Sequence, residues 1–186
     1  VLKCTHDSGG LVICKDKKEL DLIKAEKKIT KSLHNNYYFY GREWPYKNVK
    51  PRIIAEPYME DNKAHELLDY KLMCFNGEVK CSFTCSERFS QEGLKVTFFD
   101  NDWKVMPFER HYPSSKNPPK KPLNFNKMLE FATKLSRGIP FVRVDFYEIN
   151  GLLYFGELTF FPGNGFEEFT PLEWDYKMGS WLKLPK

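Results

Sequence analysis

One stretch constrains the fold of this chain more than any other: FVRVDFYEINGLLYFGELTFFPGN at residues 141–164. It predicts two strands rich in apolar residues, joined by a turn at Asn150-Gly151. Four polar side chains interrupt the apolar pattern in pairs two residues apart, namely Arg143 and Asp145 on the first strand and Glu157 and Thr159 on the second. Because strand side chains alternate between faces, each pair shares one face of its own strand. The turn decides whether both pairs share the same face.

The two possible turns give different sites. A two-residue loop pairs Ile149 with Leu152 and sends Glu157 to the face opposite Asp145. A three-residue loop pairs Glu148 with Leu152 and makes Asp145 and Glu157 diagonal neighbours. Two carboxylates that converge in an apolar hairpin need a cation, and Mg²⁺ prefers such oxygen ligands and commonly arrives with phosphate. We therefore predict a magnesium-nucleotide site that requires the three-residue loop; the alternative is that both acids are solvated on an open antiparallel sheet.

Composition limits the class of protein. With 186 residues, 41% of them hydrophobic and 16% aromatic, the chain is long enough for one domain with a core. No run approaches the ~18 apolar residues of a membrane span, and no signal peptide is recognisable. The five cysteines form no C-x-x-C pair, which favours reduced thiols in a cytoplasmic protein over a zinc site. A net charge of +4 is too weak to indicate nucleic-acid binding but is compatible with anionic ligands.

Five segments, in order, resemble the TupA-like branch of the ATP-grasp superfamily, which is associated with teichuronopeptide synthesis. They are VLKCTHDSGG, RIIAEPYM, DYKLMCFNGEV, FVRVDFYEING and YFGELTFFPGNGFEEF. The resemblance implies an α+β ATP-grasp fold of antiparallel sheets flanked by helices, with residues 1–186 as a single partial domain. Residues 1–56 would be the remainder of the small nucleotide-binding lobe, and 57–186 the large lobe with the metal-binding hairpin. Since the chain begins inside a strand, we expect an N-terminal domain and the first part of the small lobe to precede it.

The same resemblance implies a set of nucleotide-binding residues. Lys3 is the strand lysine that contacts the phosphates, under a covering loop of Ser8, Gly9 and Gly10, and His6 lies in the same turn. Glycine-rich turns let backbone N–H groups approach a phosphate, although a Ser-Gly-Gly turn alone more often marks a simple hairpin.

The hinge of the nucleotide site is expected after the strand RIIA, which we predict to be buried. Glu56 matches the hinge glutamate, and the backbone of Pro57 and Tyr58 would read the adenine edge. Either Glu60 or Asp61 would reach the ribose hydroxyls.

Metal and catalytic residues follow from the resemblance as well. Asp145, Glu157 and Thr159 would hold magnesium, with Thr159 standing where the superfamily usually has asparagine. Arg143 and Lys71 would stabilise the transferring phosphate or the acyl-phosphate. Asp69 shares a strand face with Lys71, as in the D-x-K pattern of related ligases; an ordinary cross-strand ion pair is the alternative.

The remaining segments have simpler interpretations. Residues 18–35 and 124–137 have helical apolar spacing. The first is expected to be a solvated helix that packs on the sheet, with apolar positions at Leu20, Ile23, Ile29 and Leu33. Residues 106–124 are rich in proline and lysine and predict a loop. Its cations, Arg110 included, either guide an acidic acceptor or form a solvated charge run. Aromatic side chains are expected to pin the C-terminal tail to the core, namely Phe166, Phe169, Trp174 and Trp181.

The function implied is ATP- and Mg²⁺-dependent joining of a carboxylate to an amine through an acyl-phosphate. The substrates would be small molecules or polymer precursors in cell-surface polysaccharide or teichuronopeptide-type synthesis, with glutamate as one candidate. Two alternatives stay open: a glycosyltransferase that uses a nucleotide sugar, and a nucleotide-binding module without turnover.

Overall fold

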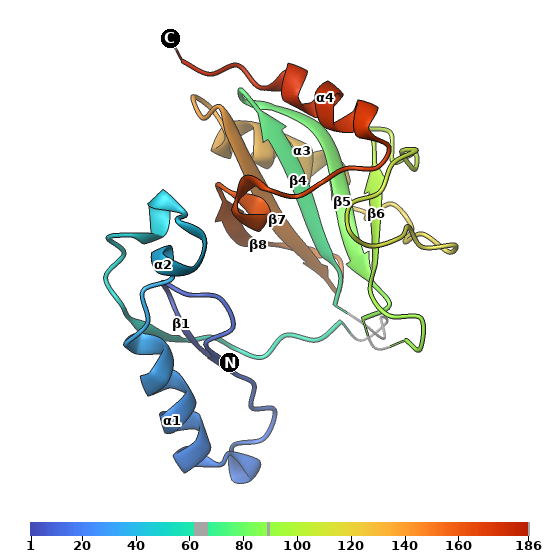
Figure 1. Cartoon of the computed structure of the whole chain (residues 1–186). Helices are drawn as coiled ribbons and strands as arrows, with labels where there is room; N and C mark the ends of the chain where they lie inside the picture. The colour runs from blue at the N-terminus through green and yellow to red at the C-terminus, as the bar shows by residue number, and fades with distance from the viewer. Residues whose placement is uncertain (62–66, 89, 186) are drawn as a thin grey trace. The chain divides into compact units, whose positions relative to one another are not determined.

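A computed structural model describes residues 1–61, 67–88 and 90–185, which form two compact units. The first unit spans Val1–Met59 and the second spans Glu60–Lys186. The boundary lies close to the hinge expected after Glu56. The two units are described separately below (Figure 1).

The first unit is a small three-stranded antiparallel sheet with helices. Strand β1 (Leu2–Cys4) lies between β2 (Leu11–Val12) and β3 (Ile53–Ala55). Helix α1 (Leu22–Leu33) packs against β1 and β2, and a short helix α2 (Tyr38–Gly41) follows. Two 3-10 turns complete the unit, η1 (Lys17–Glu19) and η2 (Trp44–Tyr46). Strand β3 was expected to be buried, but all three of its residues are exposed.

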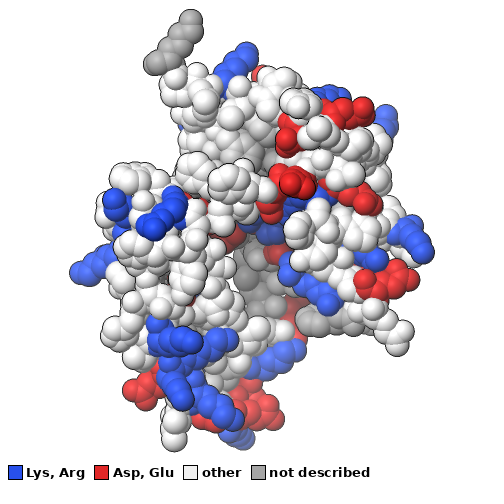
Figure 2. Space-filling view, in the orientation of Figure 1, with Lys and Arg blue, Asp and Glu red and all other residues white. Residues whose placement is uncertain are grey.

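Helix α1 presents a narrow buried stripe to its sheet. Asp21 caps its N-terminus by accepting a hydrogen bond from the Lys24 backbone. Ala25, Ile29 and Ser32, spaced four and three residues apart, are buried. The expected contribution of Ile23 is wrong, because this side chain is 80% exposed. Lysines gather over the solvent side of this helix (Figure 2), as expected for a solvated helix face.

The second unit is built on one five-stranded antiparallel sheet with the order β6-β5-β4-β7-β8. Its strands are β4 (Asp69–Phe75), β5 (Glu78–Ser86), β6 (Lys95–Phe99), β7 (Phe141–Ile149) and β8 (Leu152–Thr159). Helix α3 (Phe125–Leu135) and helix α4 (Leu172–Trp181) belong to this unit, with a turn η3 (Pro162–Gly165) after β8. The segment between β6 and α3 has no helix or strand, as predicted for residues 106–124.

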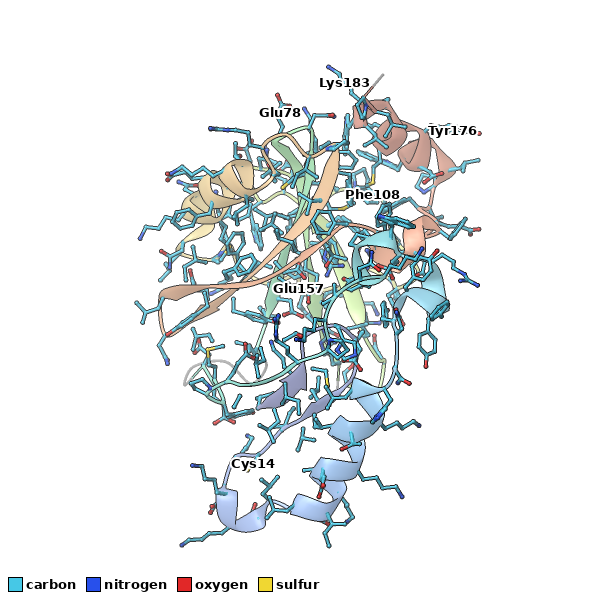
Figure 3. The ribbon with its side chains drawn as sticks, turned by 90° about the vertical axis from the view of Figure 1, so that its left-hand side faces the viewer. Cys14, Glu78, Phe108, Glu157, Tyr176 and Lys183 are labelled. Carbon is cyan, nitrogen blue, oxygen red and sulfur yellow. The ribbon has the colours of Figure 1, made fainter. Side chains whose placement is uncertain are left out.

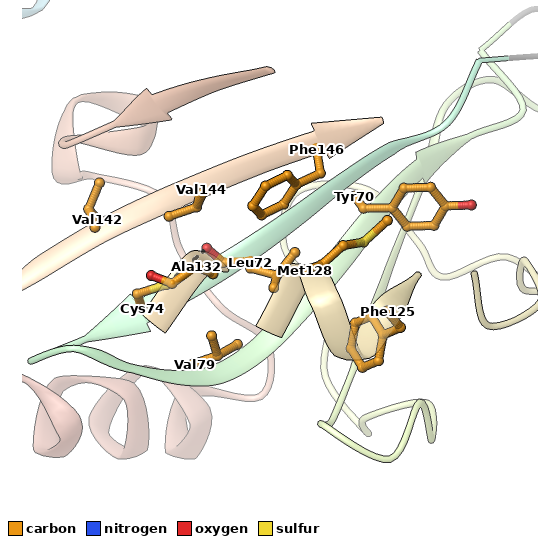
Figure 4. Close-up of a cluster of buried hydrophobic side chains, with 10 residues drawn as sticks. All are labelled: Tyr70, Leu72, Cys74, Val79, Phe125, Met128, Ala132, Val142, Val144 and Phe146. Atoms are coloured by element: carbon orange, nitrogen blue, oxygen red, sulfur yellow. Dashed lines mark hydrogen bonds between the residues drawn. The ribbon is translucent and has the colours of Figure 1, made fainter. Parts of the chain in front are cut away.

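Two hydrophobic clusters cover the two faces of this sheet. One packs even-numbered residues of β4 and β7 against Phe125, Met128 and Ala132 of α3 (Figure 4). The other packs Met73, Phe75, Phe83 and Phe98 against Trp174 and Met178 of α4. Phe108, labelled in Figure 3, stacks on Trp174 with ring centroids 4.6 Å apart. Phe166 was expected to join this packing, but it is 86% exposed.

Both tight hairpins of the sheet use the same turn chemistry. Asn76-Gly77 joins β4 to β5, and Asn150-Gly151 joins β7 to β8. All four residues have φ between 51° and 84°, which is the pattern of a type I′ turn. Ile149 pairs with Leu152, so the loop has two residues and the expectation of a three-residue loop is wrong. The primed two-residue turn is favoured because its twist matches that of the strands.

Within the described residues, no helix is both long enough and apolar enough to cross a membrane.

Candidate active site

A group of charged side chains lies on the face of the second unit's sheet that α4 partly covers. It includes side chains on the same strand face as Met73 and Phe75 of the second hydrophobic cluster. We call it the charged cluster: Asp69, Lys71, Arg143, Asp145 and Glu157, with the hydroxyl of Thr159. Strands β4, β7 and β8 are neighbours in the sheet and supply all six side chains. Every metal-binding and catalytic residue predicted from the hairpin and from the D-x-K pattern is in this group.

Asp145 is the centre of the charged cluster. Its side chain is 1% exposed and accepts from Arg143 Nε at 2.7 Å and from Arg143 Nη2 at 2.7 Å. Lys71 lies directly opposite on β4 and donates to Asp145 Oδ2 at 2.5 Å. A buried carboxylate is stable only when it is paired and hydrogen-bonded, and here two cations fulfil that condition.

Arg143 connects the two acids of the hairpin. Its Nη2 also donates to Glu157 Oε1 at 3.0 Å, and the Thr159 hydroxyl donates to the same oxygen at 3.2 Å. Burial acts to lower the pKa of Arg143, but the hydrogen bonds and charge of Asp145, with the charge of Glu157, raise it above its ordinary value. Arg143 therefore stays charged while Glu157, 63% exposed, is open to solvent.

A β-bulge places Glu157 on the face of Asp145 despite the two-residue turn. Phe146 pairs with Phe155, but Val144 pairs with Leu158, so two residues of β8 stand opposite Asp145 alone. Because of this extra residue, the side chains of β8 after Phe155 point to the face opposite the one that simple alternation would give them. The bulge includes Gly156, where a Cβ would lie 3.0 Å from the Asp145 carbonyl oxygen and from the ring of Tyr147.

The opposite end of the charged cluster is anchored by Asp69. Its Oδ2 lies 3.6 Å from Lys71 Nζ and 3.1 Å from Arg88 Nη2. Asp69 and Lys71 thus share a face, as the parity argument predicted. Burial, together with the negative charge of Asp69, raises the pKa of the Tyr147 hydroxyl, which keeps this group neutral beside the acids.

Sequence reasoning missed one ion pair on the same face. Arg110 Nη1 donates to Glu167 Oε2 at 2.8 Å, and the Arg110 guanidinium stacks over the ring of Phe83, 4.5 Å from its centroid. Arg143 lies 6.0 Å from the same centroid. Arg110 was expected to be either a solvated or a substrate-guiding cation of a loop, but its side chain is only 10% exposed. Glu167 lies in the quoted segment YFGELTFFPGNGFEEF, but no motif or periodicity in the sequence links it to Arg110.

In the first unit, two predicted nucleotide-binding residues meet. Lys3 on β1 and Glu56 after β3 form an ion pair with Nζ and Oε2 2.7 Å apart. Lys3 pairs with Ile54, two residues before Glu56, so their side chains share a face. Both are about 40% exposed, so they are open to a ligand and their ion pair contributes little to stability.

The predicted phosphate loop divides into exposed and buried residues. Ser8 and Gly9 are exposed, and Gly9 has a φ of 88°. Gly10 is buried, and a Cβ there would collide with the carboxylate of Asp7 and the hydroxyl of Ser32. His6 is 2% exposed, and its Nε2 lies 3.1 Å from the Ser32 carbonyl oxygen and 3.0 Å from that of Asn35. The structure thus directs His6 toward the end of α1.

The hinge residues lie on the exposed chain after β3. Pro57 and Tyr58 are exposed, and the ammonium of Lys15 lies 4.8 Å from the centroid of the Tyr58 ring. Asp61, in the second unit, accepts a hydrogen bond from the Asn150 backbone N–H at 3.0 Å. Asp61 is therefore tied to the β7–β8 turn.

Two carboxylates and a hydroxyl of the charged cluster are oxygen donors of the kind that Mg²⁺ takes. Both oxygens of Asp145 already accept hydrogen bonds from Arg143 and Lys71. Among the residues described, no group of three or more acidic, histidine or cysteine side chains gathers to hold a metal unaided. Mg²⁺ does not require one, since it commonly takes one or two carboxylates and completes its shell with water and substrate phosphates. Asp145 and Glu157 supply those two carboxylates, and the Thr159 hydroxyl lies beside them.

Two of the cavities among the described residues can be compared with these sites. One of about 670 Å³ in the first unit is lined by residues 11–16 and by the start of α1, and it includes none of the predicted nucleotide-binding residues. The other, of about 500 Å³ in the second unit, is mostly apolar and lies between α4 and the chain after β8. Glu167 forms part of its wall, which connects this cavity to the Arg110 ion pair.

A family model described as TupA-like ATPgrasp matches residues 1–183 of the chain. No curated protein and no solved structure matches it. The match covers both units and every residue of the charged cluster.

Proposed function

This chain belongs to the TupA-like ATP-grasp family, and we propose that it is an ATP- and Mg²⁺-dependent ligase that joins a carboxylate to an amine through an acyl-phosphate. The observation that carries the proposal is the charged cluster, in which Arg143 bridges Asp145 and Glu157 on one sheet face. Family membership supports a ligase-type role, and we assign to the charged cluster the cations and carboxylates that such a reaction would use.

Phosphoryl transfer leaves little covalent work to the protein, so neutralising and positioning charge determine the rate. Lys71 and Arg143 would stabilise negative charge on the transferring phosphate and on the acyl-phosphate. Asp145 would act by holding both cations in place, since each donates to it. Magnesium, held by Asp145 and Glu157 beside Thr159, would supply further charge neutralisation at the phosphates.

The nucleotide-binding set remains part of the proposal. Lys3 and Glu56 are supported by their shared, half-exposed face, and Ser8 and Gly9 by their exposure. His6, Gly10, Pro57, Tyr58, Asp61 and Asp69 complete the proposed set. We also propose that the first unit belongs to the small nucleotide-binding lobe and that the second is the large lobe.

The setting proposed is synthesis of a cell-surface polysaccharide or teichuronopeptide-type polymer in the cytoplasm. The five cysteines are all unpaired, which supports a reducing compartment. The carboxylate and the amine would be small molecules or polymer precursors.

The first test is calorimetric titration of a non-hydrolysable ATP analogue, with Mg²⁺ and with a chelator. Binding should require Mg²⁺ and should weaken roughly ten- to a hundredfold in Glu157→Gln, the range seen when a metal's surroundings are disturbed. Glu157 is the better target, because replacing Asp145 would leave two buried cations without their shared partner.

The matched control is Glu78→Gln, which makes the same chemical change at an exposed acid. Figure 3 shows Glu78 at the top edge of the sheet, away from Glu157. The control should bind the analogue as the wild type does. Turnover is then assayed with panels of carboxylates and amines. Absence of nucleotide binding in the wild type would contradict the proposal, and nucleoside diphosphate release from a sugar donor would support a glycosyltransferase.

A further inference from the structure

Two side-chain contacts of Arg110 and the backbone pairing of its neighbour fix the position of its guanidinium group. Glu167 accepts from its Nη1 at 2.8 Å, and Phe83 packs against the guanidinium at 4.5 Å. The adjacent residue Glu109 forms two backbone hydrogen bonds with Thr170, each 2.9 Å long, which fix the chain that carries Arg110. Guanidinium groups fixed in this way recognise oxyanions with little loss of side-chain entropy.

The position of Glu167 is fixed as well. Its side chain packs so closely over Gly163 that a Cβ there would collide with it. Gly163, Asn164 and Gly165 all have φ between 55° and 78°, so the turn after β8 is shaped to bring this acid to Arg110.

One donor of Arg110 is left without an acceptor. Its Nε is fully buried and has no hydrogen-bond partner among the described residues. An unsatisfied donor on a charged group is costly in a folded protein, and such a cost commonly persists at functional sites. The missing partner must be an acceptor, and the strongest acceptors for a guanidinium are carboxylate and phosphate oxygens.

Arg110 also lies beside a cation of the charged cluster. The guanidinium groups of Arg110 and Arg143 both lie within 6.0 Å of the Phe83 ring centroid. Two guanidinium groups this close to one ring repel each other. Asp145 and Glu157 beside Arg143, and Glu167 beside Arg110, offset part of that repulsion, and an additional oxyanion would offset more of it. The buried apolar ring beside them reduces solvent screening, which strengthens any anion contact.

We propose that Arg110, oriented by Glu167, is an oxyanion-binding residue that acts with Arg143 on the face of Phe83. The oxyanion belongs either to a phosphoryl group or to the carboxylate being activated. The role of this oxyanion in ligation rests on the proposed function, whereas its binding does not. Glu167 is a positioning residue, because it acts through Arg110.

The direct test is an NMR spectrum of the arginine Nε–H groups in the full chain labelled with ¹⁵N-arginine. Arg110→Lys identifies the Arg110 signal by its loss. Inorganic phosphate should shift this signal if the oxyanion is phosphoryl, and L-glutamate should shift it if the oxyanion is a carboxylate. Absence of a shift with both anions overturns the proposal.

The affinity of the protein for the anion shows whether the Arg110 guanidinium binds it directly or only contributes positive charge nearby. Arg110→Lys keeps the charge but loses the fork of donors, so the Kd for the anion that shifts the signal should rise about ten- to a hundredfold. An unchanged Kd in a variant that unfolds at the wild-type temperature overturns the directed contact.

The role of Glu167 has its own matched pair of variants. Glu167→Asp keeps the charge but shortens the side chain that orients Arg110, so anion affinity should fall severalfold. Glu168→Asp makes the same change at the exposed neighbouring acid and should leave affinity unchanged. Equal anion affinities of Glu167→Asp and Glu168→Asp would overturn the role of Glu167 in orienting Arg110. Both variants retain Arg110, so this comparison can be made even if Arg110→Lys does not fold.

Failure of this inference can be told from failure of the proposed function. Nucleotide binding together with an unmoved Arg110 signal refutes the inference alone. A shifted Arg110 signal in a protein that binds no ATP analogue supports the oxyanion site and refutes the ligase.

Discussion

Asp145 shows at the residue scale how two acids are tolerated in an apolar hairpin. The sequence argument required a cation between converging carboxylates, and the protein supplies Arg143 for that position, with Lys71 beside Asp145. Asp145 is buried and doubly paired, whereas Glu157 is 63% exposed. The two acids therefore differ in their surroundings: both oxygens of Asp145 are engaged by cations, whereas the Glu157 carboxylate is also exposed to solvent.

A second buried acid gives a prediction about pH. Glu43 is 6% exposed, and burial raises the pKa of its carboxyl group above the ordinary 4.5. Its protonated form is favoured by folding, so this contribution to stability is present below pH 4.5 and is lost as pH rises through the folded-state pKa. Glu43→Gln replaces a carboxylate that is charged at pH 7 with a neutral amide of similar size. It should therefore stabilise the first unit at pH 7 by about 1 kcal/mol, because a buried neutral group costs less than a buried charge.

Thermal unfolding of the wild type and of Glu43→Gln, measured at pH 4 and at pH 7, tests this effect. The gain in Tm from Glu43→Gln should grow as the pH rises. Glu26→Gln is the control, because Glu26 is exposed on α1. A gain that is equal at both pH values would show that the charge of Glu43 is not responsible.

At the scale of elements, the β7–β8 hairpin has one feature that the local sequence specifies, its turn, and one that it does not, the register of its strands. Asn150-Gly151 specifies a turn, because both positions need positive φ and few residues adopt it readily. The register beyond the turn depends on a bulge five residues away, which no alternation of apolar residues reveals. Gly156 was the available signal, since a glycine inside a strand often marks a bulge.

The bulge gives a prediction at this scale. In Gly156→Ala, the new Cβ would lie 3.0 Å from the Asp145 carbonyl oxygen, so the strands must shift and overpacking should cost about 1–3 kcal/mol. The same shift should move Glu157 away from Arg143 and weaken Mg²⁺-dependent nucleotide binding. Urea unfolding and calorimetry measure the two effects.

Gly179→Ala is the matched control for this substitution. Gly179 lies in α4, and a Cβ there meets nothing within 4 Å. Since alanine favours a helix over glycine, the control should be neutral or more stable by up to ~1 kcal/mol. A bulge variant as stable as this control, with wild-type nucleotide affinity, would contradict the role of the bulge.

Three expectations about burial failed for one physical cause, those for Ile23, Arg110 and Phe166. Tertiary partners decide whether a side chain is buried, and helical spacing, loop composition and aromatic content do not specify those partners. Ile23 and Phe166 are exposed, and Arg110 is buried by Phe83 and Glu167. The elements themselves formed close to their predicted ranges, as α1 and α3 show, because helical periodicity is a local property.

At the scale of the whole molecule, the apolar core is unevenly divided. Both large hydrophobic clusters lie within the second unit, between residues 68 and 182. Buried apolar side chains of the first unit are small or few, with Cys4, Ala25 and Ile29 as its buried hydrophobic residues among those described. Since burial of apolar area is the main favourable term in folding, we expect the second unit to be the more stable one.

This division gives the last prediction. A protein of residues 60–186 should unfold cooperatively in urea, because both clusters and the charged cluster are retained. Residues 1–59 alone should show no cooperative transition, as expected for a short chain with little apolar area to bury. If the Arg110 oxyanion site is local to the second unit, phosphate or glutamate should shift the Arg110 signal in 60–186 as in the full chain. Loss of cooperative unfolding in 60–186 would instead mean that its sheet depends on the first unit.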